Sequence, residues 1–265
     1  VSRALGANDL GKANALVLHA ALICLGMGLF FTFVFIVWGE PMLRLLGGQG
    51  EALAQSLAYA NVAFWGAASI WLTNGFASVI RGSGNMKTPS LVLLIACVAQ
   101  VTLSGVLGLG WGPIPSFGMA GIAMGYVIAF SASTLYLFAY LRSSRSMLRL
   151  SFKSPLSKPL FMDILKVGAM SSLSTLQTVA TILILTRLIS SFGPEALAGY
   201  GIGTRLEFLL VPMTFAFGVA CVPMVGMALG AQLFERAKKV AWAGSLMSAA
   251  LIGDIGLLVT VWPGV

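Results

Sequence analysis

Charged residues are scarce in this sequence. Only 9% of its 265 residues are Asp, Glu, Lys or Arg, against ~25% in a typical soluble domain. Hydrophobic residues make up 58% of the chain, and the mean hydropathy is +0.95. Uncharged stretches as long as the ~20 residues that cross a bilayer recur along the whole chain. This composition excludes a soluble globular domain and predicts an integral membrane protein.

Groups that carry catalysis or bind metals are also rare. The sequence has one histidine, and its three cysteines (Cys24, Cys97 and Cys221) lie inside apolar runs without CxxC or metal-ligand spacing. It contains no Ser-His-Asp, Glu-x-x-His or paired-carboxylate pattern, and its two Gly-x-Gly-x-Gly stretches lack a Walker lysine. We therefore expect neither an enzyme nor a cofactor, and the sequence identifies no metal site.

The apolar residues form seven continuous segments. Continuous runs of this length favour helices over a β-barrel, whose strands are ~10-residue segments of alternating polarity. The predicted fold class is therefore an all-α integral membrane protein with seven spans present in this sequence. The predicted spans are Ala13 to Trp38, Ala52 to Ile80, Ser90 to Leu109, Gly118 to Leu141, Leu160 to Ile189, Ala196 to Leu229, and Val240 to Trp262.

Basic residues are concentrated in alternate connections. Loops 1–12, 81–89, 142–159 and 231–239 hold twelve Lys and Arg, whereas the connections on the opposite side hold only Arg44. Loop Lys/Arg bias sets orientation, so these four loops are predicted to be cytoplasmic in a plasma membrane, the inner membrane of a bacterium. This topology explains the net charge of +8, and we expect no nucleic-acid partner.

An internal repeat determines how the spans are counted. Residues Val1 to Asn14 (VSRALGANDLGKAN) return as a near copy at Val225 to Lys238 (VGMALGAQLFERAK), and the shift places Gly6 on Gly230. Six predicted spans separate the two copies. An even number of spans keeps the orientation, as in parallel repeats related by an axis along the membrane normal.

The repeat predicts a twelve-helix molecule made of two parallel six-helix lobes, of which this sequence is a part. Its longest connection is basic, contains Pro155 and Pro159, and is the natural boundary between lobes. We expect residues 1–141 to hold the last four helices of the N-terminal lobe. Residues 142–159 are then a basic cytoplasmic linker, and residues 160–265 hold the first three helices of the C-terminal lobe.

Two further stretches carry a family resemblance. They are Arg81 to Pro89 (RGSGNMKTP) and Ala198 to Glu207 (AGYGIGTRLE). Together with the two copies of the ALGA loop, they resemble the multidrug and toxic compound extrusion (MATE) transporters, and the resemblance covers the chain as family helices three to nine. The motif residues that carry it are Arg81, Gly82, Gly84, Pro89, Gly6 and Gly230.

This resemblance implies secondary active multidrug efflux. The family exports amphipathic organic cations in exchange for sodium or protons by alternating access of two lobes. The implied partners are small-molecule substrates, membrane lipid and the coupling sodium ion or proton, with the protein as a monomer. In characterised branches, carboxylates in the first, seventh and tenth family helices hold the coupling cation. The seventh corresponds to Leu160 to Ile189, where that position falls near Gln177 or Thr178, both uncharged.

Polar residues inside the predicted spans are the candidates for a site. An ionisable side chain in a span costs ~2.5 to 3.5 kcal/mol on insertion scales and is a functional hypothesis by default. Uncharged polar residues can line a cavity, although hydrogen bonding between helices is their commoner role. The candidates for cation coupling or for a substrate cavity are Glu207, Asp254, Arg205, Gln177, Thr178, Asn61 and Asn74.

Glycine and proline spacing gives two expectations about helix packing. Gly118, Gly121 and Gly125 lie close to one helical face, so we expect a neighbouring helix to approach closely there. Pro212 and Pro223 are about three turns apart and are expected to bend their span.

Two other functions remain as alternatives. A flippase for a lipid-linked saccharide has a related fold, but its cavity needs a strongly cationic lining for pyrophosphate, and the arginines of these spans are Arg187 and Arg205. A heptahelical receptor would account for seven spans. A receptor of this kind does not explain why a cytoplasmic loop is repeated after six spans.

Overall fold

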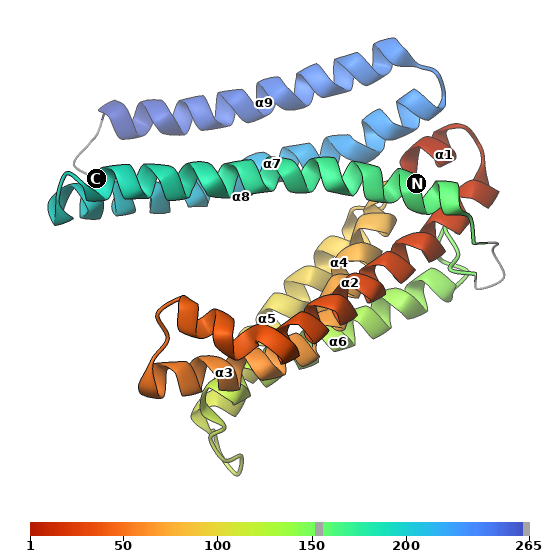
Figure 1. The fold of residues 1–265 in the computed structure, drawn as a ribbon. Helices are drawn as coiled ribbons and strands as arrows, with labels where there is room; N and C mark the ends of the chain where they lie inside the picture. Colours follow the sequence, from red (N-terminus) through yellow and green to blue (C-terminus); the bar gives the residue numbers. More distant parts are fainter. Residues whose placement is uncertain (152–155, 262–265) are drawn as a thin grey trace. The chain divides into compact units, whose positions relative to one another are not determined.

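The computed structural model describes residues 1–151 and 156–261, and all regular secondary structure in them is helical. The side chains that it does not describe within these ranges are those of Pro194, Leu206, Glu207, Leu209 and Val259. Pro155 of the predicted linker and Trp262 at the end of the last predicted span lie outside the described residues. The helices, shown in Figure 1, are α1 (Ser2–Gly6), α2 (Leu10–Leu45), α3 (Gly50–Trp65), α4 (Ala67–Gly82), α5 (Lys87–Leu109), α6 (Gly118–Arg142), α7 (Lys158–Ser190), α8 (Pro194–Gly230) and α9 (Phe234–Val261).

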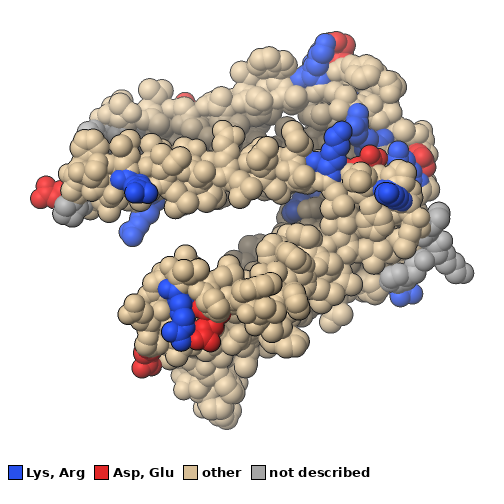
Figure 2. Space-filling model, viewed as in Figure 1, with Lys and Arg blue, Asp and Glu red and all other residues tan. Residues whose placement is uncertain are grey.

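Six of these helices are long and apolar enough to cross a membrane: α2, α5, α6, α7, α8 and α9. They coincide with six of the seven predicted spans. On the face seen in Figure 2, charged side chains lie mostly near helix ends, and broad uncharged surfaces separate them. Both observations confirm the all-α membrane class. The remaining predicted span, Ala52 to Ile80, is divided into two helices of 16 residues each, α3 and α4.

The division occurs at Gly66. Its backbone has φ −85° and ψ −1°, and a ψ near zero takes the chain out of the α-helical path. A Cβ at this position would collide with the side chain of Val127. The break is compensated from α2, because the Thr32 hydroxyl lies 2.5 Å from the carbonyl oxygen of Phe64 and donates to it. A carbonyl in a membrane span needs such a partner, since lipid offers none.

The chain divides into two compact units. The first unit consists of Val1, Arg3–Leu5 and Asp9–Leu156. The second unit consists of Ser2, Gly6–Asn8 and Ser157–Val265. In the first unit, α6 packs against α3, α4 and α5, and α2 packs against α3 and α4. In the second, α8 packs against both α7 and α9. The boundary after Leu156 falls inside the connection that the sequence analysis assigned to a linker.

The hydrophobic core of the first unit lies at its predicted cytoplasmic end. It contains Val17 of α2, Ile80 of α4 and Leu137 of α6, all of them almost fully buried. Leu148 and Leu150 belong to the same core, and the backbone N–H of Leu150 donates to the Leu141 carbonyl at 3.1 Å. Residues 143–151 are therefore packed onto the first unit, so the start of the predicted linker is a structural part of that unit.

Helices α5 and α6 approach each other at two glycines. A Cβ on Gly121 would collide with the Leu107 backbone, and a Cβ on Gly125 would collide with the Ser104 backbone. The expected close packing is confirmed at these two positions. Gly118 differs, because it starts α6 with φ +56° and has open space around it.

Hydroxyl groups join α4 to α6. Thr73 Oγ1 lies 2.9 Å from the Phe130 carbonyl and 2.7 Å from Thr134 Oγ1. Thr134 in turn donates to the Ser69 carbonyl at 2.7 Å. Hydroxyl side chains in membrane spans commonly form such hydrogen bonds between helices.

The two copies of the repeat form the same backbone elbow. Asn8 and Gln232, which the repeat aligns, have φ values of +56° and +61°, and within the described residues no other non-glycine residue has a positive φ. The next residue closes the turn in both copies: the Asp9 N–H donates to the Ala4 carbonyl at 2.9 Å, and the Leu233 N–H donates to the Ala228 carbonyl at 2.8 Å. These bonds satisfy the carbonyls at the ends of α1 and α8. The repeat that the sequence predicts is thus confirmed in the backbone.

The Gln232→Gly variant is expected to stabilise the fold. A left-handed conformation strains a residue with a Cβ and leaves glycine unstrained, and we expect a gain of about 0.5 to 1 kcal/mol. Thermal unfolding in detergent measures it as a higher melting temperature. The control is Gln232→Ala, which removes the amide but keeps the Cβ, and it should not stabilise. Equal melting temperatures for the two variants would contradict the assigned strain.

Candidate functional site

A cavity of about 330 Å³ lies between α7 and α8 of the second unit. It brings together two sequence candidates, Gln177 and Thr178 of α7, with Tyr200 and Thr204 of α8. Its other lining residues are Thr181, Ile182, Leu185, Thr186, Phe208 and Val211. Polar groups from two helices therefore meet one apolar wall, the usual character of a small-molecule site.

The threonines of this cavity are already bonded as donors. Thr178 donates to the Ser174 carbonyl at 3.1 Å, and Thr181 donates to the Gln177 carbonyl at 2.9 Å. Thr186 and Thr204 bond in the same way to carbonyls of their own helices. A hydroxyl whose proton is used in this way keeps lone pairs as acceptors. The lining thus presents mainly acceptor oxygens.

The cavity is also lined by two aromatic side chains and by the amide of Gln177. Phe208 and Tyr200 contribute rings, and ring faces attract cations. The ten lining residues that the structure describes include no Lys, Arg, Asp or Glu. The arrangement suits an organic cation held by acceptor oxygens and ring faces, without a formal counter-ion.

Other candidates are not in this cavity. Arg205 is exposed on α8, and Asp254 is exposed on α9. Glu207 belongs to α8, but its side chain lies outside the described residues. In the first unit, Asn61 is exposed on α3, and Asn74 is exposed on α4 with its amide donating to the Ile70 carbonyl at 2.9 Å.

The sequence analysis missed Tyr200, Thr204, Thr181 and Thr186. A signal for them exists, because Thr178 and Thr181 are three residues apart and Tyr200 and Thr204 are four apart, so each pair shares a helical face. The sequence does not show which faces of α7 and α8 meet. The tertiary structure brings these four residues to one cavity.

The Arg81 to Pro89 motif forms the elbow from α4 to α5. Gly84 has φ +89°, a conformation that glycine adopts without strain, and Gly82 and Pro89 are buried. The Arg81 guanidinium donates to Ser78 Oγ at 3.1 Å, and partial burial lowers its pKa from the ordinary value. These contacts are local and structural.

Asn85 of this motif fixes the elbow to α6. Its Oδ1 accepts the Thr88 N–H, in the first turn of α5, at 3.1 Å, and its amide nitrogen donates to Tyr140 Oη at 2.9 Å. The motif therefore orients α5 against α6. The glycines of the other motif are equally structural: a Cβ on Gly6 would collide with the backbone of Met227, which belongs to the same unit, and Gly230 ends α8.

The chain is similar to known transport proteins along most of its length. The model of the MatE family matches residues 1–106 and 171–265. The probable multidrug resistance protein YoeA of Bacillus subtilis is 24% identical over 268 residues, which is 99% of this chain and 58% of the relative. The multidrug export protein MepA of Staphylococcus aureus is 28% identical over 213 residues, which is 78% of this chain and 45% of the relative.

A solved structure has the same fold. The crystal structure of MATE in the bent conformation superposes with a TM-score of 0.92 at 21% identity, covering 99% of this chain and 58% of that one. The chain spans about half the length of the curated relatives it matches. Six apolar helices and bacterial relatives make it an integral protein of the plasma membrane. Because the family model covers most of its length, the chain belongs to the MatE family.

Proposed function

We propose that the complete protein exports amphipathic organic cations from the cytoplasm, in exchange for sodium or protons, by alternating access. The observation that carries this proposal is the uncharged, acceptor-rich cavity between α7 and α8. An organic cation with apolar groups can place its charge near the threonine oxygens and its rings against Phe208 and Tyr200. The names of the two bacterial relatives, which refer to multidrug resistance and multidrug export, support export of small molecules.

The composition of the cavity favours this function over transport of a lipid-linked saccharide. A pyrophosphate group needs Lys or Arg nearby, because charge-assisted donors are what bind phosphate oxygens. The described lining contains neither residue type. We therefore favour a cationic substrate over an anionic one.

We assign the coupling ion to a carboxylate outside this cavity. Asp254 lies about two-thirds of the way along its predicted span, Val240 to Trp262, and an ionisable side chain inside a span is a functional hypothesis by default. Glu207 of α8 is the second candidate, on sequence grounds. Either carboxylate can exchange a proton or bind sodium through its oxygens.

The proposal is tested with the complete gene product in proteoliposomes loaded with a fluorescent lipophilic cation. A sodium or proton gradient imposed across the membrane should accelerate export of the dye several-fold. The Asp254→Asn and Glu207→Gln variants should identify the coupling carboxylate, because the one that matters loses the gradient dependence. Export that proceeds at the same rate with and without both gradients would contradict antiport.

A further inference from the structure

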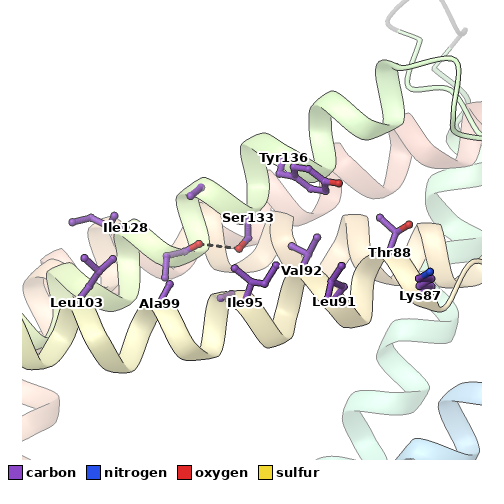
Figure 3. Close-up of a pocket in the computed structure, with 13 residues that line it drawn as sticks. Lys87, Thr88, Leu91, Val92, Ile95, Ala99, Leu103, Ile128, Ser133 and Tyr136 are labelled. Atoms are coloured by element: carbon purple, nitrogen blue, oxygen red, sulfur yellow. Dashed lines mark hydrogen bonds between the residues drawn. The ribbon is translucent and has the colours of Figure 1, made fainter.

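A second cavity, of about 410 Å³, lies between α5 and α6 of the first unit. Figure 3 shows it as a groove that follows the two helices, with Lys87 and Thr88 at one end and Leu103 and Ile128 at the other. Lys87 is the only charged residue among its thirteen described lining residues. The groove is therefore apolar along its length and cationic at one end.

The groove is longer than the hydrocarbon thickness of one lipid leaflet. Leu91, Ile95, Ala99 and Leu103 recur every fourth residue along α5 and form one wall. From Lys87 to Leu103 the helix rises about 24 Å at ~1.5 Å per residue. One leaflet contributes about half of a ~30 Å hydrocarbon core, so the groove is long enough for an acyl chain. Ser133 does not change this polarity, because its hydroxyl donates to the Ala129 carbonyl at 2.8 Å.

The rim of the groove is exposed. Leu91 is 52% exposed, and Ile95 on the same wall is 58% exposed. Ile128 and Tyr136 of α6 are also exposed on the opposite wall. An apolar ligand can thus enter from the side of the helix pair.

The polar end of the groove is suited to an anion. Lys87 is the first residue of α5, where the helix dipole also favours negative charge. Thr88 Oγ1 accepts from the Asn85 amide at 2.9 Å, which leaves its own proton to donate. This end belongs to loop 81–89, which the sequence predicts to be cytoplasmic, and the cytoplasmic leaflet carries the anionic lipids.

We propose that the groove between α5 and α6 binds an acyl chain of an anionic phospholipid of the cytoplasmic leaflet, with the headgroup phosphate on Lys87 and Thr88. The site is separate from the α7–α8 cavity and does not depend on the transported substrate. The lipid would cover the exposed apolar walls of α5 and α6 and would hold the elbow formed by the Arg81 to Pro89 motif at the membrane surface.

The test is lipid titration of the complete, delipidated gene product in detergent, followed by native mass spectrometry. Phosphatidylglycerol and phosphatidylcholine with the same acyl chains are compared. The unmodified protein should bind phosphatidylglycerol more tightly. The Lys87→Gln variant should bind it about five-fold more weakly, since one lysine near the surface contributes ~1 kcal/mol.

Matched variants separate this groove from general surface effects. Lys158→Gln removes the charge of the lysine that begins α7, the same helix position that Lys87 has in α5. It should leave the affinity for phosphatidylglycerol unchanged. Ala99→Phe fills the groove and should weaken both lipids, whereas Val98→Phe, at an exposed position outside the lining, should weaken neither. Equal effects of the two lysine variants, or equal binding of the two lipids, would overturn the proposal. So would the absence of saturable binding, which is expected if another chain segment fills the groove.

Discussion

A Thr178→Arg variant is expected to lose export of lipophilic cations almost completely. Thr178 lines the α7–α8 cavity, and a guanidinium there stays charged at every usable pH. At ~6 Å and an effective dielectric constant of ~20, repulsion between two unit charges is about 2 to 3 kcal/mol, which corresponds to a loss of about 30- to 150-fold in substrate affinity. Dye efflux from cells that express the complete gene product measures this loss.

Two further variants isolate the cause of that loss. Thr175→Arg introduces the same charge three residues earlier, at an exposed position outside the lining, and carries the same cost of membrane insertion. It should retain export. Thr178→Met adds bulk to the cavity without charge and should reduce export much less than Thr178→Arg. If Thr175→Arg abolishes export as completely as Thr178→Arg, the cavity is not the substrate site.

A Gly125→Val variant is expected to separate α6 from α5. Any Cβ at this position collides with the Ser104 backbone, which cannot rotate away as a side chain could. We expect a destabilisation of about 3 kcal/mol, at the upper end for overpacking. In a protein of this size that lowers the melting temperature by roughly 6 to 12 °C, which thermal unfolding in detergent would detect.

Gly105→Val is the matched control for this prediction. Gly105 belongs to the facing helix α5, and a Cβ there meets nothing within 4 Å. It has the same change in helix propensity and side-chain size, so any difference between the variants reports the collision alone. A Gly105→Val protein as unstable as Gly125→Val would mean that α5 and α6 do not pack through these glycines.

The repeat was the most informative feature of the sequence. It aligned Asn8 with Gln232, and the structure gives both a left-handed backbone at the same point of an elbow. Gly121 and Gly125 were equally readable, because glycines spaced by four residues in a span point to one close contact. Local signals of this kind predicted most of the helices and their approximate ends.

The features that sequence reasoning missed depend on contacts between distant segments. Gly66 looked like any glycine in an apolar span, since membrane helices tolerate glycine. Its break is held by Thr32 and covered by Val127, neither of which is near it in sequence. Tyr200 and Thr204 were missed for the same reason, because they become site residues only when α8 is placed against α7.

The two elbows differ in the side chain at the start of the following helix. In the first, the Asp9 carboxylate accepts the Lys12 N–H at 2.8 Å and caps the following helix. In the second, the aligned residue is Leu233, whose side chain has no acceptor, yet the backbone turn is retained. The same turn geometry is thus present with a capping carboxylate in one copy and without one in the other. The likeness of the two halves at this point is therefore a likeness of backbone conformation, which does not require the same residue at the helix cap.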